Sequence, residues 1–344
     1  MPASSLASAL VWPLPLPGEQ YAVRVLSAPE PVLPLAYTPW LYLTPAHLAL
    51  QRNPGEQLHF LLEERAAGQT VAQLAVFEEE TATGVVARSP WQAPFGAVQA
   101  AEHVPAAALR AFLEVVEQQL ARRGVRHLTL RPHAFVYQPR ASAQLSQVLT
   151  ALGYAVELAE LNMHLPLHQS YSGRLHPSER RRLLKCERHG LRFEQEPPLL
   201  LPLAYEFLRR CREEKGQTLS MSLERLQELF QKFPRQHFLF SVRDAQGEWA
   251  ALTVVVQVSD DVLYNFYPAS PLAYNSLSPV VMLNAGLHAF GQASGMRLLD
   301  LGTSTLPTGL NQSLLQFKRH LGGIPSLKLT FAKALPTPQQ ASPG

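Results

Sequence analysis

The sequence has few cysteines, few charged residues and no long apolar run, and each shortage excludes a class of protein. Among its 344 residues are only two cysteines, Cys186 and Cys211, which cannot build a disulfide framework and match no zinc motif. Charged residues make up 17% and hydrophobic residues 47%, which excludes a disordered chain. Apolar runs such as Leu252–Val256 are far shorter than the roughly 18 residues that cross a bilayer. We therefore expect neither a metal site nor a membrane span.

The N-terminal segment Met1–Pro17 lacks the basic residues of an export signal. It contains four prolines, and the first Lys or Arg of the chain is Arg24. Because a secretory signal needs a positively charged start, we interpret this segment as a loose leader or an edge segment. The expected location is the cytoplasm.

Charge is divided unevenly along the chain. Residues 1–167 contain 10 basic and 13 acidic residues, a net of −3, whereas residues 168–344 contain 20 and 14, a net of +6. All four aspartates and all six lysines lie in the second part. Such an excess is typical of a solvated surface, and it also permits contact with something anionic.

The length favours two domains of about 100–200 residues each, and an internal repeat indicates where they lie. Gly124-Val-Arg-His-Leu-Thr-Leu aligns with Gly295-Met-Arg-Leu-Leu-Asp-Leu, an offset of 171 residues. An amphipathic helix is expected before each glycine, over Pro105–Arg123 and from Ser278 onward. The second of these helices has Ser278 as its expected N-cap and Pro279 at its first position.

The repeat extends on both sides of these segments. Each copy has a hairpin and a further short strand before the helix, and a strand, a helix and a strand after it. In the second copy we expect strands His237–Val242, Trp249–Val256, Val262–Tyr267 and Met296–Leu301, a loop Gly302–Gly309 and a helix Asn311–Leu321. Coincidence among common α/β patterns is the alternative. The predicted domains are residues 1–167 and 168–344.

A basic helix is expected between the two copies, beginning at Pro177-Ser-Glu. The surrounding segment contains Arg174, Arg180, Arg181, Arg182, Lys185, Arg188 and Arg192. Its charge permits three interpretations: a solvated face, a platform for a phosphate-rich donor or RNA, and contact with an anionic membrane surface. The near absence of interleaved aromatic residues does not support sequence-specific RNA stacking, and the helix lacks the bulky apolar face of a membrane-surface helix.

Three stretches of the second half resemble the Fem-type and acetyltransferase-6-type branch of the GNAT superfamily of N-acyltransferases. They are the basic helix from Ser178 to Leu191, the helix end Arg212-Glu-Glu-Lys-Gly-Gln, and Leu299-Asp-Leu-Gly-Thr-Ser followed by the run from Gly309 to Gly323. The resemblance covers about residues 170–333, and the first half is similar to a degenerate copy. It implies an α/β (α+β) fold of two tandem GNAT-like domains, each a mixed central sheet flanked by helices.

The resemblance implies a donor cleft between strands Val262–Tyr267 and Met296–Leu301, with acyl-CoA as the donor substrate. The donor would lie on the turn before the following helix, at Asn275, Ser276, Leu277 and Ser278. This turn departs from the superfamily motif, since it has no glycine and Pro279 lacks an N–H. A well-capped helix without a ligand is the alternative. In the first copy Glu102 occupies the corresponding place, so we expect the N-terminal domain to be a scaffold.

Two side chains are candidates for catalysis. Asp300 is an acid within an apolar strand, which is costly unless it is paired, so we expect Lys318 or a loop amide as its partner. Asp300 is then either a base or amine anchor, or a pin for the loop after it. Tyr267 is a candidate general acid, although packing is the alternative for both Tyr264 and Tyr267. Further candidates at the mouth of the cleft are Tyr264, Asn284, His288, Thr303, Ser304, Asn311 and Lys318.

The expected function is transfer of an acyl or aminoacyl group from a thioester or ester to an amine. The amine is expected to attack directly, because no activated Ser or Cys is apparent. One alternative is a non-catalytic GNAT-fold binding or scaffold module. Another is a Fem-type peptidyltransferase of cell-wall synthesis, which takes its donor from aminoacyl-tRNA. The expected partners are a small-molecule acyl donor and an amine acceptor. The segment Arg174–Arg192 is a candidate site for an anionic partner. The only nucleic acid considered is charged tRNA, as the alternative donor.

Overall fold

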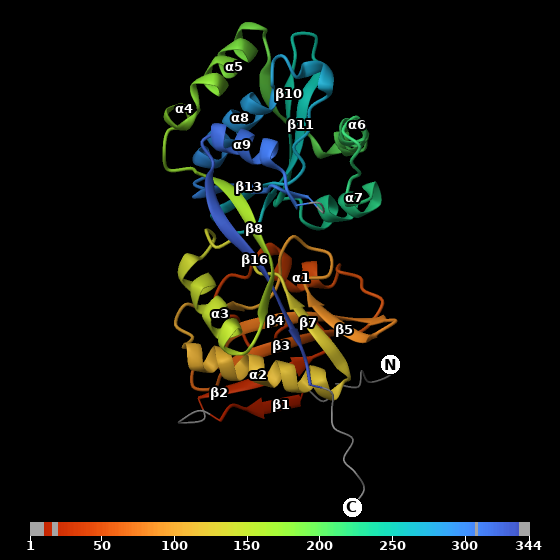
Figure 1. Ribbon diagram of the computed structural model, residues 1–344, viewed down its shortest axis with the longest axis vertical. Coiled ribbons are helices and arrows are strands. Elements are labelled where there is room, and N and C mark those ends of the chain that lie inside the picture. Colours follow the sequence, from red (N-terminus) through yellow and green to blue (C-terminus); the bar gives the residue numbers. More distant parts are fainter. Residues whose placement is uncertain (1–9, 16–19, 307–308, 337–344) are drawn as a thin grey trace, which may run out of the picture. The chain divides into compact units, whose positions relative to one another are not determined.

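The computed structural model describes residues 10–15, 20–306 and 309–336. They form two compact units: unit 1 consists of the described residues up to Ala159 and from Leu327 onward, and unit 2 of those from Glu160 to Ser326. Each unit is a mixed sheet with helices packed on it (Figure 1), as expected from the sequence. No helix in the described ranges is long and apolar enough to cross a membrane.

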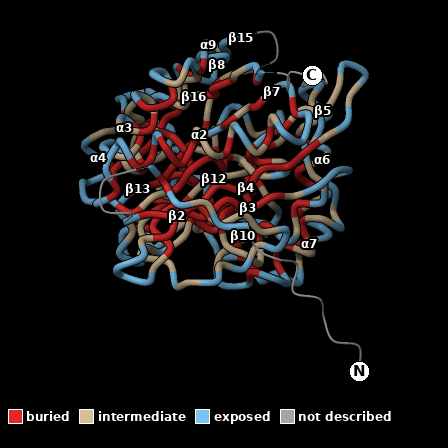
Figure 2. Tube along the Cα trace, turned by 90° about the horizontal axis from the view of Figure 1, so that it is seen from below, coloured by how far each residue is buried: buried red, intermediate tan, exposed pale blue. Residues whose placement is uncertain are grey.

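Unit 1 is built on a sheet in which only one neighbouring pair of strands is parallel. The strands, in sheet order, are β1 (Leu10–Pro13), β2 (Tyr21–Leu26), β3 (Gln57–Glu64), β4 (Gln69–Thr81), β5 (Gly84–Ser89), β7 (Val125–Leu130) and the end of β16 (Ile324–Ala334), with β6 (Gln99–Ala100) beside β4. The parallel pair is β5–β7. Strands β3 and β4 are buried along most of their length (Figure 2). Of the segment Met1–Pro17, the structure describes residues 10–15, which contain the edge strand β1. Residues 1–9 and 16–17 lie outside the described ranges.

The helices of unit 1 match the sequence periodicity. They are α1 (Pro45–Leu48), α2 (Ala106–Arg122) and α3 (Pro139–Ala151), with a short 3-10 turn η2 (Leu41–Leu43). The amphipathic helix expected over Pro105–Arg123 is α2, and its apolar stripe is buried at Leu109, Phe112, Leu113, Val116 and Leu120. At about 1.5–3 kcal/mol for each large apolar side chain, this stripe holds the helix on the sheet.

Unit 2 repeats the arrangement. Its sheet runs β8 (Ala155–Pro166), β13 (Leu298–Thr303), β12 (Val262–Asn265), β11 (Trp249–Gln257), β10 (His237–Arg243) and β9 (Arg192–Glu196). Only β12–β13 is parallel among these pairs. The other elements are α4 (Tyr171–Arg174), α5 (Pro177–Arg188), η3 (Pro198–Leu200), α6 (Leu201–Glu213), α7 (Leu223–Lys232), η4 (Leu272–Tyr274), α8 (Val280–Ala293), the hairpin β14 (Thr305–Leu306) and β15 (Gly309–Leu310), and α9 (Gln312–His320).

The predicted repeat is present in the order of elements. The series β3, β4, β5, α2, β7, α3, β8 corresponds to β10, β11, β12, α8, β13, α9, β16, with a parallel pair at the same place. The aligned glycines Gly124 and Gly295 both have left-handed backbone, with φ of 82° and 70°. Glycine adopts this conformation without the steric cost that a Cβ would add. The repeated glycines therefore mark the same helix end in each copy.

The last strand of each copy belongs to the sheet of the other unit. Residues Asn162–Pro166 of β8 pair with β13, and Phe331–Ala334 of β16 pair with β7. The units therefore divide at 159/160 and 326/327, whereas the sequence analysis placed a single boundary at 167/168. The difference arises because periodicity identifies a strand but not its hydrogen-bonded neighbour.

Three local expectations differ from the structure. Strand β12 ends at Asn265, two residues before Tyr267. Ser278 does not cap α8: Pro279 is the N-cap residue, and Ser278 has a left-handed φ of 55°. The loop Gly302–Gly309 includes the end of β13 and the strands β14 and β15, while residues 307–308 lie outside the described ranges.

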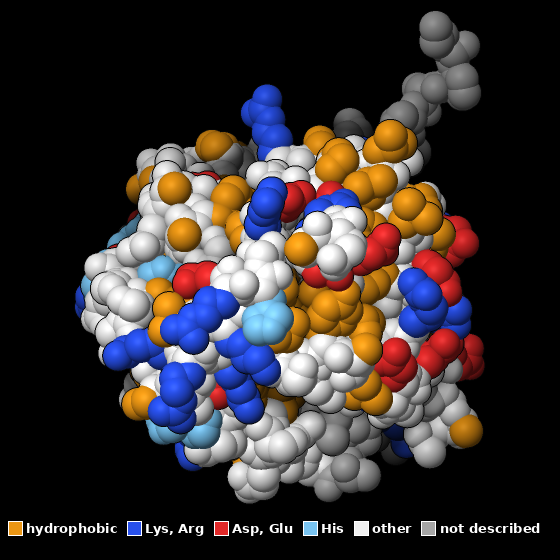
Figure 3. Space-filling view, turned by 90° about the horizontal axis from the view of Figure 1, so that it is seen from above, with side chains coloured by type: hydrophobic (Ala, Val, Ile, Leu, Met, Phe, Trp, Pro, Cys, Tyr) orange, Lys and Arg blue, Asp and Glu red, His pale blue; other side chains and the backbone are white. Residues whose placement is uncertain are grey.

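The basic helix is α5, and most of its cationic side chains are exposed. Figure 3 shows Lys and Arg side chains gathering on the face seen from above, and α5 lies at the top of Figure 1. Arg180, Arg181, Arg188 and Arg192 are exposed. Arg182 is paired with buried Glu179 at 2.8 Å, and Lys185 donates a hydrogen bond to the Ser276 carbonyl oxygen at 2.9 Å. Part of this charge therefore holds α5 to its own unit.

Candidate functional site

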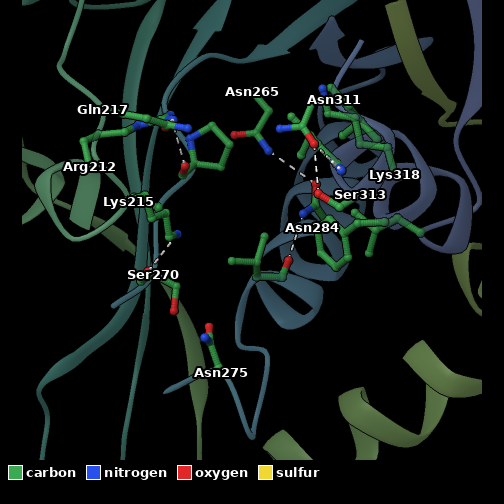
Figure 4. A pocket seen from close by; sticks show the side chains of 17 residues that line it. Arg212, Lys215, Gln217, Asn265, Ser270, Asn275, Asn284, Asn311, Ser313 and Lys318 are labelled. Carbon is green, nitrogen blue, oxygen red and sulfur yellow. Dashed lines mark hydrogen bonds between the residues drawn. The ribbon is translucent and has the colours of Figure 1, made fainter. Parts of the chain in front are cut away.

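Unit 2 contains a cavity of about 490 Å³ beside the ends of β12 and β13. Its walls come from the end of α6, the segment after β12, the first turns of α8, and α9 (Figure 4). The polar lining residues are Arg212, Lys215, Gln217, Asn265, Ser270, Asn275, Asn284, Asn311, Ser313 and Lys318. Four of these, Asn275, Asn284, Asn311 and Lys318, are candidates from the sequence.

Two buried asparagines join α8 to the end of β12. Thr253 donates to the Asn265 side-chain oxygen at 2.6 Å, and the Asn265 amide donates to Asn284 at 3.3 Å. The Asn284 amide in turn donates to the Val280 carbonyl oxygen at 2.8 Å. Because each donor has a defined acceptor, this chain fixes both side chains in the cavity wall.

Lys318 is the buried cation of the cavity. Its Nζ donates to the carbonyl oxygens of Gly302 and Thr303 at 3.0 and 2.6 Å, and the residue is 8% exposed. Burial disfavours the charged form and lowers the pKa of Lys318 to about 8, although the nearby Asp300 carboxylate opposes this shift. The ammonium therefore loses its proton much closer to neutral pH than an ordinary lysine does.

This pKa predicts a specific dependence of stability on pH. Between about pH 8 and 10.5 the unfolded chain binds more protons at Lys318 than the folded chain, so folding becomes more favourable as pH rises through this range. Between about pH 7 and 9.5, the unfolding free energy of the native chain should rise by about 2 kcal/mol relative to Lys318→Met. Urea unfolding of both proteins at pH 7 and 9.5 measures this change in the difference between their unfolding free energies.

The control for this measurement is Lys328→Met, which removes a lysine of unit 1 whose Nζ donates to the Pro94 carbonyl oxygen at 2.9 Å. If the unfolding free energies of the native chain and Lys318→Met differ by the same amount at both pH values, the lowered pKa of Lys318 is contradicted.

Asp300 fixes the loop that holds Lys318. Its Oδ1 accepts hydrogen bonds from the Gly302 N–H at 2.6 Å and from the Asn162 amide at 2.8 Å, and the residue is 4% exposed. Gly302 has a left-handed φ of 72°, so the tight turn suits glycine. Of the two partners expected from the sequence, the loop amide bonds Asp300 directly. Asp300 is not among the residues that line the cavity.

Tyr264 and Tyr267 lie in different surroundings, because the strand expected over Val262–Tyr267 does not reach Tyr267. Strand β12 ends between them, at Asn265. Tyr264 pairs in register with Asp300, and a Cβ on Gly302 would lie 3.4 Å from its ring. Tyr267 packs in the core beneath α6, with its hydroxyl 2.5 Å from Ser220 Oγ. Burial raises the pKa of both tyrosines.

The expected donor turn bonds three of its N–H groups, those of Asn275, Leu277 and Ser278, to nearby carbonyl oxygens. The N–H groups of Leu277 and Ser278 both donate to the Tyr274 carbonyl oxygen at 3.0 Å, and the Asn275 N–H donates to Leu272. The carbonyl oxygens of Ser276 and Leu277 accept hydrogen bonds from α5. The turn therefore differs from the row of free N–H groups that a phosphate-binding turn presents.

Of the remaining candidates, His288 lies apart, whereas Ser304 and Asn311 are joined by a backbone hydrogen bond. His288 is 1% exposed and packs against Tyr171, with ring centroids 5.1 Å apart. Ser304 is fully buried, and its carbonyl oxygen accepts the Asn311 N–H at 2.8 Å. Asn311 caps α9 through the Leu314 N–H at 3.0 Å. Of these three, the cavity includes Asn311 alone.

Sequence reasoning missed the α6 side of the cavity, including Arg212, Lys215 and Gln217. These residues lie in the helix-end stretch that carried part of the family resemblance, but nothing in their spacing showed that they face β12. Asn265 was missed as well, although it directly follows a candidate, Tyr264. Among the described residues, no group of three or more His, Cys, Asp or Glu side chains is placed to hold a metal ion.

Comparison with solved structures gives the fold. FemX matches with a TM-score of 0.63 and 12% identity, over 80% of this chain and 87% of that chain. A conserved protein from Bacteroides thetaiotaomicron matches with a TM-score of 0.56 and 9% identity, over 85% and 90%. L-PGS from Bacillus licheniformis matches at 0.50 and 14%, over 76% and 81%. No protein-family model matches the sequence, and no curated protein does.

Proposed function

We propose, from the tandem GNAT fold that the chain shares with Fem-like proteins, that unit 2 transfers an acyl or aminoacyl group to an amine. The donor is a thioester or ester, with acyl-CoA as the first candidate. The observation that carries this proposal is the cavity at the ends of the parallel pair β12–β13, which has the buried cation Lys318 in its wall. Unit 1 serves as the scaffold.

The reaction begins when the neutral amine attacks the donor carbonyl carbon. The C=O electrons move to oxygen, and collapse of the tetrahedral intermediate breaks the C–S or C–O bond. One proton passes from the cation to the leaving sulfur or oxygen, and the neutral base that remains takes up the proton that the attacking amine loses. A cation near the cavity is suited to stabilise the oxyanion and to protonate the leaving sulfur or oxygen. We assign this role to Lys318, since its pKa of about 8 lies close to neutral pH.

Asp300 acts in this scheme through the loop. Its hydrogen bond to the Gly302 N–H orients the carbonyl oxygens of Gly302 and Thr303, and these hold the ammonium of Lys318. Asp300 is therefore a positioning residue. Tyr267 is the second candidate for a proton donor, and its hydrogen bond to Ser220 would have to rearrange before it could serve.

A second candidate function takes its donor from charged tRNA. The exposed arginines of α5 favour it, because a nucleic acid backbone is recognised mainly by cationic side chains. A third, ligand binding without catalysis, is favoured by the internally bonded turn at Asn275–Ser278.

Thermal unfolding of the full chain separates these functions. With acetyl-CoA, a longer acyl-CoA, free coenzyme A or charged tRNA at 100 times its Kd, binding should stabilise the protein by about 2.7 kcal/mol. Stabilisation by a thioester supports acyl-CoA as donor, and stabilisation by charged tRNA alone supports the second function. If a thioester binds but no thiol is released with any amine, the binding function stands and the transferase is rejected.

A further inference from the structure

One corner of the cavity carries positive charge that the described residues do not neutralise. The corner consists of Arg212, Lys215 and Gln217, at the end of α6, and we call it the Arg212 corner. In Figure 4 these side chains come from the side opposite Lys318 and Asn311. Among the 17 described lining residues are three cations, Arg212, Lys215 and Lys318, and no Asp or Glu.

The backbone after α6 builds this corner. Gly216 has a left-handed φ of 64°, which reverses the chain, and the Gln217 N–H then donates to the Arg212 carbonyl oxygen at 2.9 Å. The carboxylate of Glu214 accepts the Leu272 N–H at 2.8 Å, and Lys215 Nζ donates to the Ser270 carbonyl oxygen at 3.3 Å. The end of α6 is thereby joined to the segment that follows β12.

In the part of the chain that the structure describes, the hydrogen-bond partners of Arg212 are neutral. Its guanidinium donates to the Gln217 side-chain oxygen at 2.9 Å and to the Pro268 carbonyl oxygen at 3.5 Å. Within the described ranges no carboxylate forms an ion pair with Arg212 or Lys215, whereas Arg209 on the same helix binds Glu206 at 2.6 Å and also Glu213. A half-buried guanidinium without an anion bears a desolvation cost that an anionic ligand would remove.

The titration of Arg212 agrees with this geometry. Burial lowers the pKa of Arg212, and the opposing influences come from Tyr267 and Cys211 instead of a carboxylate. In contrast, Glu206 raises the pKa of Arg209. The charge of Arg212 is therefore desolvated but not compensated by the described residues.

We propose that the Arg212 corner binds an oxyanion, a carboxylate or a phosphate ester, that is carried by the amine acceptor. The planar guanidinium fork matches either group in two parallel hydrogen bonds, and Lys215 adds a point charge. A cavity of about 490 Å³ suits a compact ligand, which favours the acceptor over a large nucleotide donor. The acceptor amine then lies on the side of Lys318. This inference rests on the proposed function, because it takes the cavity ligand to be the acceptor.

Isothermal titration of the full chain without any donor tests the corner. The probes are β-alanine, O-phosphoethanolamine and ethanolamine at constant ionic strength. We expect the native chain to bind at least one of the two anionic amines more tightly than ethanolamine. Arg212→Gln should weaken that binding by about 10- to 100-fold, because a hydrogen bond to a charged group is lost. The probe that binds more tightly distinguishes a carboxylate from a phosphate acceptor.

Two further variants make the result decisive. Lys215→Met changes an exposed side chain and should weaken the same binding even if Arg212→Gln unfolds the chain. Arg209→Gln, on the same helix, should leave it unchanged. The proposal is overturned if neither anionic amine binds, or if Arg209→Gln weakens the binding as much as Arg212→Gln does. It is also overturned if binding survives Arg212→Gln. Should Arg212→Gln be unfolded, survival of binding in Lys215→Met overturns it instead. Failure of the proposed function would appear separately, as missing thiol release while oxyanion binding persists.

Discussion

Lys318→Met is expected to lower kcat for acyl transfer by about 10²–10³-fold, the loss that follows removal of one donor to a developing oxyanion. Methionine keeps the length and apolar part of the side chain but supplies no ammonium to the intermediate or to the leaving group. The measurement is thiol release from acetyl-CoA with β-alanine or O-phosphoethanolamine as acceptor. KM for the donor should change little, because the interaction is made mainly in the transition state.

Lys328→Met is the matched control, since it makes the same substitution in unit 1. It should leave kcat unchanged. Activity of Lys318→Met within about threefold of the native chain would reject the assignment, because the lost interaction would then be worth less than about 1 kcal/mol.

Glu196→Ala is expected to lower the free energy of unfolding by about 3 kcal/mol at neutral pH, because the buried Ser241 hydroxyl and the partly exposed Arg243 lose their hydrogen bonds to the carboxylate. Glu196 is 5% exposed at the end of β9, and its carboxylate accepts hydrogen bonds from Arg243, Ser241 and the Trp249 indole. Removal of the carboxylate takes this acceptor from the Ser241 hydroxyl and the Trp249 indole, whereas Arg243 keeps the Gly247 carbonyl oxygen and the exposed Glu194 as partners. The loss would loosen β9, which leads through η3 into α6 and so to the Arg212 corner.

The pH dependence gives an independent test of this network. Burial alone would raise the pKa of Glu196, but the hydrogen bonds from Arg243, Ser241 and Trp249 outweigh it and lower the pKa. The stabilisation is therefore present above the ordinary glutamate pKa and is lost as pH falls through the folded value. The difference between the native chain and Glu196→Ala should shrink in acid. Glu194→Ala is the control, because Glu194 is exposed and 3.4 Å from Arg243, and should cost at most about 1 kcal/mol.

The part of the candidate site that could be predicted from the sequence is the part where burying a charged side chain among apolar residues is costly. Asp300 was a candidate because it is an acid within an apolar strand, and a loop amide was one of its two expected partners. In the structure that amide is the Gly302 N–H. The expected strand Val262–Tyr267 was too long, since β12 ends at Asn265 and Tyr267 packs separately in the core beneath α6. Arg212 could not be recognised, since an arginine at a helix end looks the same whether it faces water or a cavity.

The sequence by itself determined the elements and their repetition. Apolar spacing located α2 and α8, and Gly124 and Gly295 marked the left-handed ends of these helices. Only the tertiary structure decided that β8 and β16 complete the sheets of opposite units, and that Lys318 and the Arg212 corner line one cavity. The physical reason is that periodicity and turn chemistry depend on neighbours within a few residues, whereas the partners of β8 and β16, and the placing of Arg212 and Lys318 in one cavity, depend on residues more than a hundred positions apart.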